Sequence, residues 1–520
     1  MRLLRVASTL VFAFTASAQP VLLTGPVTLN PGAATITPTS GGDPVPLATA
    51  EITVEGTRLT VNGPHTIASL TLRRSAGNVA AVVTHDANFV GGGVNGLSLT
   101  ITGDLIVQGA AGSLVGSSID VYGKGWPYQQ GPGIGVGFGQ GAGSSGHGGS
   151  GTTSYNGSGG GGTYGSAKHP VTFGTGAKSY PIGSPPGGGG CVRLIVGGTA
   201  SIDGQVIAEG DFASFGFGGG GYTHAGSSAG SVWITAHALQ GSGSITAHGG
   251  QGLTPGGGGR IAIECHIPIR PSFSGLIAAW GGHNGFGGSA ATLRTSAGTV
   301  YLRSATGRGL FIIDGGTTVP STSSLPNIAV GEAADPWGDL GNVDFHIRNG
   351  GAARIASGDV VSFAGDAVID TGAKLELNST LRAGGHATLG GAGAAVTISH
   401  AANTPNTLVS PGCMLDVVGD MLIAANATLN GDGRGYPPGQ GPGLSPFFPN
   451  SGSAGHGGIG AIGYGGLAGG GMYGSPTEPI TYGTGGVNQA AGGGAFRVVV
   501  GGDLTLDGRV SADAAGVGSD

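Results

Sequence analysis

Two short segments, GCVRLIVGG at residues 190–198 and GAFRVVVGG at residues 494–502, decide the fold of this 520-residue chain. In the first, Val192, Leu194 and Val196 fall on every second residue, the period of a strand with one buried face. The same period recurs at three further places: Val232 and Ile234, Ile261 and Ile263, and Val300 and Leu302.

Each of these strands is followed, after about 10–15 residues, by a second short apolar run: Val206-Ile207, Ile245, Leu276-Ile277 and Leu310 to Ile313. Recurring strand pairs predict stacked rungs, each of which buries its apolar face against its neighbours. We therefore expect an all-β fold, a right-handed parallel β-helix (solenoid) with long glycine-rich loops. Serial antiparallel β-sandwich units are the alternative, because hairpin signals such as Asn62-Gly63 also occur.

The composition supports short strands joined by glycine-rich turns. Glycine supplies 116 of the 520 residues, charged residues only 9%, and hydrophobic residues still 39%. No Gly-X-Y register runs through the chain, which excludes collagen. Coiled coils and helical bundles need Ala, Glu, Lys and Leu in quantity, so they are excluded as well.

The chain also contains an internal repeat. GKGWPYQQGPG at 123–133 matches GRGYPPGQGPG at 433–443, GHGG at 146–149 matches 455–458, and the two opening segments match each other. We expect five parts: 1–18 signal peptide, 19–95 N-terminal cap and first rungs, 96–317 first glycine-rich repeat, 318–413 connecting rungs, and 414–520 a second repeat that looks cut short. A fragment of a longer protein, or a neighbouring chain that caps the last rung, would explain the short second repeat.

The N-terminus has the pattern of a secretory signal. Arg2 and Arg5 precede an apolar core at 6–15, and Ala16-Ser17-Ala18 is a small-residue cleavage site. Cleavage after Ala18 predicts a secreted protein, extracellular or on the cell surface. The apolar core is too short to span a bilayer, so we expect no membrane helix. A charge of −6 without clustered Lys and Arg disfavours nucleic acid as a partner.

The quoted segments, together with YGS followed by FGTG or YGTG, and AGTVYLR at 297–303 followed by FIIDGG at 311–316, resemble a known repeat type. It is the glycine-rich repeat of large secreted bacterial proteins of the adhesin-like or autotransporter-like, β-helical class. The resemblance covers roughly 96–317 and 414–520. It implies a secreted β-helical stalk or surface protein and brings no established active site.

Aromatic side chains in the glycine-rich loops are the candidate ligand contacts, because exposed rings can stack on sugars or bury partner surface. They are Trp126, Tyr128, Tyr164, Tyr436 and Tyr473. The alternative is that these rings pack the loops onto the side of the scaffold.

The densest acidic patch holds Glu332, Asp335 and Asp339, followed by Asp344. Oxygen ligands at these intervals could hold Ca²⁺, and paired carboxylates could serve a polysaccharide-cleaving site. A solvated connecting loop is the alternative. Residues 123–190 contain no Asp or Glu, so the first glycine-rich loop cannot supply such a pair.

Two sets of side chains have a structural interpretation. His147 and His456 occupy equivalent GHGG positions, and we expect imidazoles that donate to loop carbonyls rather than metal ligands. The odd number of cysteines, Cys191, Cys265 and Cys413, favours three buried strand thiols over one disulfide and a free thiol.

No catalytic residue is predicted. We expect a secreted or cell-surface structural or adhesive protein, whose scaffold presents its loops to a surface, a glycan or a protein partner. A polysaccharide lyase or glycoside hydrolase on a β-helix is one alternative, supported by fold analogy alone. A self-assembling coat or filament module, associating through its C-terminal rung, is the other.

Overall fold

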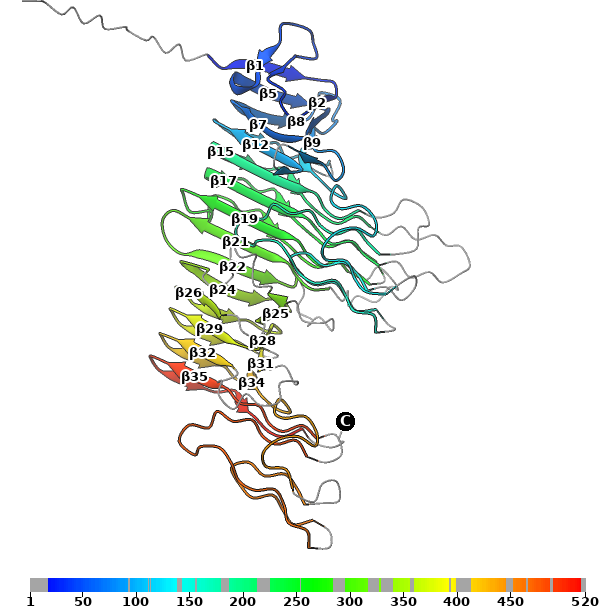
Figure 1. The fold of residues 1–520 in the computed structure, drawn as a ribbon. Coiled ribbons are helices and arrows are strands. Elements are labelled where there is room, and N and C mark those ends of the chain that lie inside the picture. Colours follow the sequence, from blue (N-terminus) through cyan, green and yellow to red (C-terminus); the bar gives the residue numbers. More distant parts are fainter. Residues whose placement is uncertain are drawn as a thin grey trace, which may run out of the picture.

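The computed structural model describes residues 17–520 except 92–93, 111, 113, 138–142, 155–156, 179–186, 213–224, 253, 284–294, 317–326, 329–339, 356–359, 392–393, 399–412, 446–451, 464–465, 487–489 and 516–520. The described chain is almost entirely strand and connecting segment, and its one helix is a single 3₁₀ turn, η1 (Leu47–Thr49). Figure 1 shows the strands stacked one upon another along an elongated molecule.

A sheet of 16 strands runs through the whole stack. Its members are β1 (Gln19–Leu23), β5 (Ala50–Glu55), β7 (Gly63–Ile67), β8 (Ser69–Arg73), β12 (Leu97–Ile101), β13 (Leu105–Val107), β15 (Cys191–Ile202), β17 (Ser231–Gln240), β19 (Arg260–Cys265), β21 (Thr299–Ser304), β22 (Gly309–Asp314), β24 (Val343–Arg348), β27 (Ala367–Ile369), β30 (Ala387–Leu389), β33 (Met421–Ile423) and β36 (Leu504–Leu506).

Three smaller sheets complete the stack. The seven-stranded sheet holds β2 (Val27–Leu29), β6 (Arg58–Val61), β9 (Val82–Thr84), β14 (Ser118–Asp120), β16 (Gln205–Ile207), β18 (Ser244–Thr246) and β20 (Leu276–Ala278). The six-stranded sheet holds β23 (Asn327–Ile328), β25 (Ala352–Ile355), β28 (Lys374–Leu377), β31 (Ala395–Ile398), β34 (Thr428–Asn430) and β37 (Arg509–Ser511). The four-stranded sheet holds β26 (Val360–Phe363), β29 (Thr380–Ala383), β32 (Met414–Val417) and β35 (Arg497–Val500).

Successive turns of the chain pair in parallel and in register. Val192 of β15 lies beside Val232, Val232 beside Ile261, and Ile261 beside Val300. All four side chains are buried in one core. Val206, Ile245 and Ile277 form a second column of this kind in the seven-stranded sheet. The sequence period therefore identified the buried faces correctly, and a nearly all-β structure with parallel sheets is confirmed.

Antiparallel pairing is confined, among the described strands, to three places: β21 with β22, β3 (Thr35–Ile36) with β4 (Val45–Pro46), and β10 (Val90–Gly91) with β11 (Val94–Asn95). Serial antiparallel sandwich units are therefore excluded for the described part of the chain. The Asn62-Gly63 pair is not a hairpin turn, because β6, which ends at Val61, and β7, which begins at Gly63, belong to different sheets. It forms a corner, where the buried Asn62 amide donates to Asp86 at 2.7 Å.

The chain reverses direction between β21 and β22. Only four residues, 305–308, connect the two strands, and Gly307 adopts a positive φ of 89°. So short a connection returns the chain to the neighbouring antiparallel position. The prediction that Leu310 to Ile313 form a second run like those in the seven-stranded sheet is therefore wrong, because β22 pairs with β21 itself.

The hydrophobic core changes to the other face of the long sheet at this reversal. Val300 and Ile312 pair on the face of the first core, whereas Tyr301 and Phe311 pair on the face of the second. The second core continues through Phe345, whose ring stacks on Phe311 at 5.7 Å. Reversal of the strand direction and change of the buried face occur together, so parallel stacking resumes from β22 onward.

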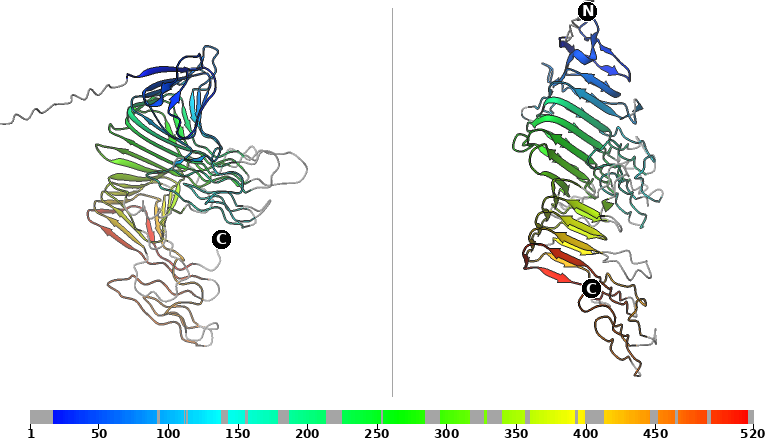
Figure 2. Two further views of the ribbon diagram at one scale, coloured as in Figure 1. Left: turned by 45° about the horizontal axis from the view of Figure 1, so that its top comes forward. Right: turned by 60° about the vertical axis from the view of Figure 1, so that its left-hand side comes forward.

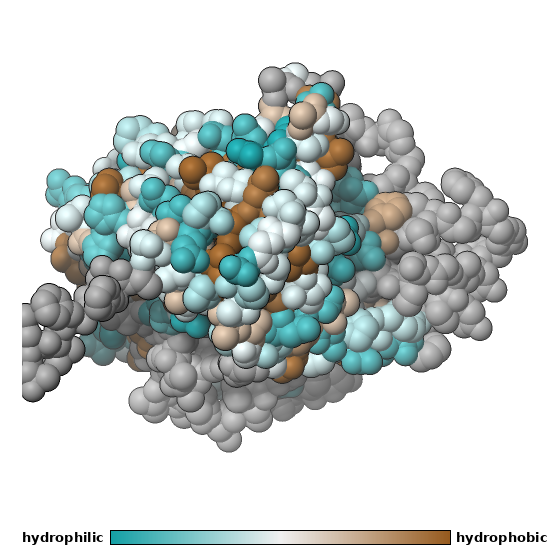
Figure 3. Space-filling model, turned by 90° about the horizontal axis from the view of Figure 1, so that it is seen from above, coloured by the Kyte–Doolittle hydropathy of each residue, from teal (hydrophilic) through white to brown (hydrophobic). Residues whose placement is uncertain are grey.

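The end of the stack that carries β1 is closed by the segment between β2 and β5. Ile36 and Leu47 of that segment are buried in the first core. Viewed from this end, the surface is mostly hydrophilic, and apolar residues form narrow strips (Figure 3). Covering the open end of a strand stack keeps its apolar core from water.

The three cysteines are free and buried, as the sequence predicted. Cys191 begins β15, Cys265 ends β19, and Cys413 immediately precedes β32. Burial raises the pKa of Cys191 to about 12 and the pKa of Cys265 to about 11, so both thiols stay protonated at neutral pH.

Phe345 tests the position of the second core. We expect Phe345→Ala to lower the free energy of unfolding by about 3–5 kcal/mol, because it removes a ring stacked between Phe311 and Phe363. Val79→Ala, at a side chain that is 57% exposed, should change it by less than about 0.5 kcal/mol. Urea denaturation followed by tryptophan fluorescence measures both, and equal effects would contradict the assignment of the core.

Candidate functional site

Four insertions leave the stack at one corner of successive turns. Residues 121–190, 208–230, 247–259 and 279–298 follow β14, β16, β18 and β20, which are neighbours in the seven-stranded sheet. We call these four insertions the first lobe. Residues 431–496, between β34 and β35, form the second lobe. In Figures 1 and 2 the first lobe projects from the side of the strand stack, and the second lobe extends beyond β35 at the end of the stack.

A glycine immediately precedes each strand of the long sheet that follows an insertion of the first lobe: β15, β17, β19 and β21. Gly190, Gly230, Gly259 and Gly298 lie one above another, and the carbonyl of each of the first three accepts a backbone hydrogen bond of 3.0–3.1 Å from the following turn. A Cβ on Gly230, Gly259 or Gly298 would overlap the carbonyl oxygen of the glycine in the preceding turn. Only glycine permits this spacing of the turns at the corner.

Inside the first lobe, backbone packs directly against backbone. Gly161 donates to Ser144 at 2.8 Å, and Gly151 donates to Gly161 at 2.8 Å. A Cβ on Gly161 would overlap the carbonyl oxygen of Gly133. The segments carry no regular secondary structure, yet their peptide groups are paired and mostly buried, so the lobe is a packed body in which glycine replaces the side-chain core.

A buried polar cluster joins the lobe to the next turns. His147 is fully buried, with Nδ1 2.8 Å from the Ala229 carbonyl oxygen and Nε2 2.7 Å from Thr172 Oγ1. Burial, aided by the positive charge of Arg260, lowers the pKa of His147 to about 3. Arg260, also fully buried, donates from Nε to the Tyr164 carbonyl at 2.7 Å. His147 is therefore a neutral structural group, as the sequence suggested.

The second lobe repeats the hydrogen bonds of the first. Gly125 donates to Gly188 at 2.6 Å, and Gly435 donates to Gly492 at 2.6 Å. The same correspondence holds for three further pairs: Trp126 to Gly174 and Tyr436 to Gly483, Tyr164 to His147 and Tyr473 to His456, and Gly161 to Ser144 and Gly470 to Ser453. The matched sequence segments thus adopt matched backbone arrangements.

The predicted aromatic contacts lie in the lobes, and all five are half-buried. Tyr164 donates its hydroxyl to the Phe173 carbonyl at 2.6 Å, and Tyr473 donates to the Tyr482 carbonyl. Trp126 meets Phe173 edge to face at 6.2 Å, and Tyr436 meets Tyr482 in the same way. Their rings help to hold the lobes together, and a role in ligand contact stays a prediction. The Tyr128 hydroxyl accepts a hydrogen bond from the neighbouring Gln129 amide at 2.8 Å.

The predicted metal ligands Glu332, Asp335 and Asp339 lie outside the described residues. Asp344, which follows them, is in β24 and accepts from Arg308 at 3.0 Å. Within the described ranges, no three His, Cys, Asp or Glu side chains cluster closely enough to hold a metal ion. Within the same ranges, no helix is long and apolar enough to cross a membrane.

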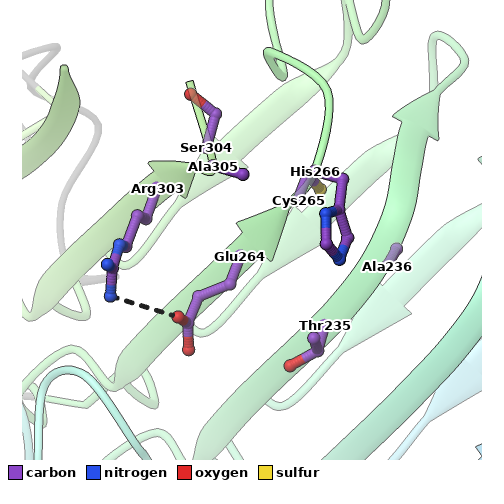
Figure 4. A pocket seen from close by; sticks show the side chains of 8 residues that line it. All are labelled: Thr235, Ala236, Glu264, Cys265, His266, Arg303, Ser304 and Ala305. Atoms are coloured by element: carbon purple, nitrogen blue, oxygen red, sulfur yellow. Dashed lines mark ion pairs between the residues drawn. The ribbon is translucent and has the colours of Figure 1, made fainter. Parts of the chain in front are cut away.

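A shallow groove of about 270 Å³ lies at the ends of β19 and β21, beside the middle of β17. Glu264 and Arg303 point toward one another across it, with Oε2 and Nη1 3.9 Å apart (Figure 4). The stacked rings of His237 and His266 lie nearby, with centroids 5.6 Å apart. The lining residues are Thr235, Ala236, Glu264, Cys265, His266, Arg303, Ser304 and Ala305.

The chemistry of this groove suits binding better than bond cleavage. Glu264 is the single carboxylate among its lining residues, whereas glycoside hydrolysis uses a pair. Cys265 is buried, and its raised pKa keeps it a thiol, which is a poor nucleophile. The groove therefore offers one acid, one guanidinium and one imidazole to a polar ligand.

Sequence reasoning missed both the groove and the role of Arg260. The groove residues lie on three strands that are separated by two insertions, and their register was needed to bring them together. Arg260 follows four consecutive glycines at 256–259, which was the available signal that a long side chain enters a glycine-lined space.

Comparison of the chain with family models, with curated proteins and with solved structures gives no significant match. Its function is therefore argued from the residues and contacts described above.

Adjacent glycines provide a matched test of the lobe packing. Gly161→Ala should destabilise the first lobe by about 1–3 kcal/mol, because its Cβ meets the Gly133 carbonyl. Gly162→Ala should be neutral or slightly stabilising, because no described atom lies within 4 Å of that Cβ and Gly162 is exposed. Limited proteolysis of the lobe measures the difference, and equal cleavage rates in the two variants would refute backbone packing.

Buried histidines make stability depend on pH. Burial lowers the pKa of His85 to about 4 and the pKa of His147 to about 3. As the pH falls, both imidazoles are therefore protonated in the unfolded chain before they are protonated in the folded chain. The free energy of unfolding is therefore greatest above about pH 6.5 and falls toward pH 4, by roughly 1.4 kcal/mol per pH unit for each histidine. We expect the urea concentration at the unfolding midpoint to decrease as the pH is lowered from 6.5 to 5, and to decrease less steeply with pH in His147→Gln. An unchanged slope in that variant would contradict the assignment.

Proposed function

We propose that the chain is a secreted or cell-surface structural protein, whose parallel strands form a right-handed parallel β-helix that presents two glycine-rich lobes to a partner. Right-handed connection is the strong preference for parallel strands joined by crossovers. The signal-like N-terminus and the resemblance to adhesin-like repeats support export. The ordered stack of turns supports a rigid scaffold.

One observation carries the adhesive role. Four insertions leave the stack at the same corner of successive turns to form the first lobe, and in both lobes the backbone is held by matched hydrogen bonds. A pre-ordered surface loses little conformational entropy on binding, which favours recognition of an extended partner. A polysaccharide-cleaving enzyme is supported less well, because the groove beside the lobe offers a single carboxylate.

A depletion assay tests this function. Residues 19–520 are incubated with soluble and insoluble polysaccharides and with matrix proteins, and both protein lost from solution and new sugar ends are measured. We expect retention without new sugar ends. Release of new ends would overturn the adhesive assignment, as would failure of every surface to retain the protein.

A single variant localises the binding surface if retention is seen. Tyr128→Ala should weaken retention about tenfold, or about 1.4 kcal/mol, because this half-buried ring of the first lobe is one of the predicted aromatic ligand contacts. Val79→Ala, an exposed apolar change on the strand stack, should leave retention unchanged and serves as the control. Equal retention by the two variants would place the contact elsewhere than at Tyr128.

A further inference from the structure

Two Glu–Arg pairs of the long sheet share the same register but differ in geometry. Glu55 of β5 pairs directly with Arg73 of β8. Glu264 of β19 pairs with Arg303 of β21 in the same way. All four side chains lie on the face that points away from the first core, because they alternate with residues that are buried in it. The chain therefore contains its own reference for such a pair.

The first pair is closed and the second is open. Arg73 Nε donates to Glu55 Oε2 at 2.8 Å. Arg303 Nη1 and Glu264 Oε2 stay 3.9 Å apart, which is beyond hydrogen-bond distance. The exposed fractions of the two carboxylates are similar, 23% and 26%, so burial does not account for the difference. Within the described part of the chain, the Glu264 carboxylate and the Arg303 guanidinium make no hydrogen bond, and both are available to a ligand.

The open pair lines the groove at the ends of β19 and β21. The groove volume of about 270 Å³ is close to the lower end of the range for small-molecule sites, about 300 Å³. Ala236, Cys265 and Ala305 give it an apolar lining, beside which Glu264 and Arg303 supply charged groups. A mostly apolar surface with a few polar groups is the usual composition of a ligand site.

A flat ring surface adjoins the open pair. His266 lines the groove and lies on the same side of the sheet as Glu264 (Figure 4). Its ring stacks on the ring of His237 in the preceding turn, with an angle of 28° between the two planes. Both histidines are exposed, so a ligand in the groove can reach their rings from solvent.

The charge of the groove is balanced. Glu264 and Arg303 are the only Asp, Glu, Lys or Arg residues among those that line it. An anionic ligand would be repelled by Glu264, and a cationic ligand would be repelled by Arg303. A neutral ligand uses both groups if it donates to the carboxylate and accepts from the guanidinium, and hydroxyl groups can do both.

We propose that the groove at Glu264 and Arg303 is a binding site for one unit of a neutral polysaccharide or oligosaccharide. Adjacent sugar hydroxyls donate to the carboxylate and accept from the guanidinium, while the C–H face of the sugar ring packs against His266 and Ala305. The inference goes beyond the proposed function, because the groove lies on strands of the scaffold and outside both lobes.

Titration of residues 19–520 with neutral oligosaccharides tests the site. The probes are cellohexaose, xylohexaose, mannohexaose and maltohexaose, and saturation-transfer NMR measures their binding. The hexamers of galacturonic acid and of glucosamine serve as the anionic and cationic comparisons. We expect saturable binding of at least one neutral probe, and weaker binding of both charged hexamers, because each charged hexamer meets one like charge in the groove.

The two Glu–Arg pairs supply matched variants. Glu264→Ala combined with Arg303→Ala should weaken binding at least about tenfold, because it removes two charge-assisted hydrogen bonds to the ligand. Glu55→Ala combined with Arg73→Ala removes a pair of the same register away from the groove, and should leave binding unchanged. Both double variants should fold, because exposed ion pairs contribute little to stability, and circular dichroism checks this.

Glu264→Gln separates a neutral ligand from a charged one. The amide can still hydrogen-bond to a hydroxyl group, but it forms a weaker bond than a carboxylate and no longer repels an anion. Binding of the neutral probe should therefore weaken, and binding of the galacturonic acid hexamer should strengthen.

Three results would overturn the proposal: no neutral probe binds the wild-type chain, the two double variants bind equally, or Glu264→Gln binds the neutral probe more tightly than the wild type does. Retention of the protein through its lobes is measured separately with Tyr128→Ala. Failure of the groove to bind a sugar would therefore leave the proposed function standing.

Discussion

Close approach of one backbone to another is the constraint on which the rest of this structure depends. At the corner of the turns that carry the first lobe, a glycine Cα lies against the carbonyl oxygen of the turn before it, as Gly230 does against Gly190. The same approach recurs throughout the lobes, where Gly161 meets Gly133. Any side chain would force these segments apart, so the high glycine content follows from packing and not from flexibility alone.

Packing of this kind also explains why so few charges are present. Buried peptide groups must be paired, and in the lobes they pair with one another or with short hydroxyl side chains. A charged side chain in such a setting has no room and little solvation. Arg260 of β19 is fully buried against the first lobe, where it donates to the Tyr164 carbonyl and the Thr299 hydroxyl. Burial and this positive charge together keep the pKa of His147 low.

Much of the strand architecture could be predicted from the sequence, because a buried face imposes a period of two. Val192, Val232, Ile261 and Val300 were identified in this way, and they form one column. The reversal at β21 and β22 could not be predicted. Leu310 to Ile313 are apolar on both faces, because each face meets a different core, and an unbroken apolar run does not reveal its pairing direction.

The candidate site was harder to anticipate than the fold. The aromatic residues were found by type, but whether a ring such as Tyr164 points into a lobe depends on contacts that sequence spacing does not encode. Burial of the lobe glycines was equally hidden in the sequence. Gly148 and Gly149 are buried, whereas Gly457 and Gly458, in the same GHGG motif, are exposed.

Native-state hydrogen exchange of the wild-type chain tests backbone packing in the lobes most directly. The amides of Gly146, Gly151, Gly161 and Gly174 are hydrogen-bonded in the lobe without belonging to any strand. If the lobes are packed bodies, these amides should be protected to within about tenfold of the amides of β12 and β15. Exchange at the rate of an unfolded peptide, while the strands stay protected, would show that the lobes are loose loops and contradict the structure described here.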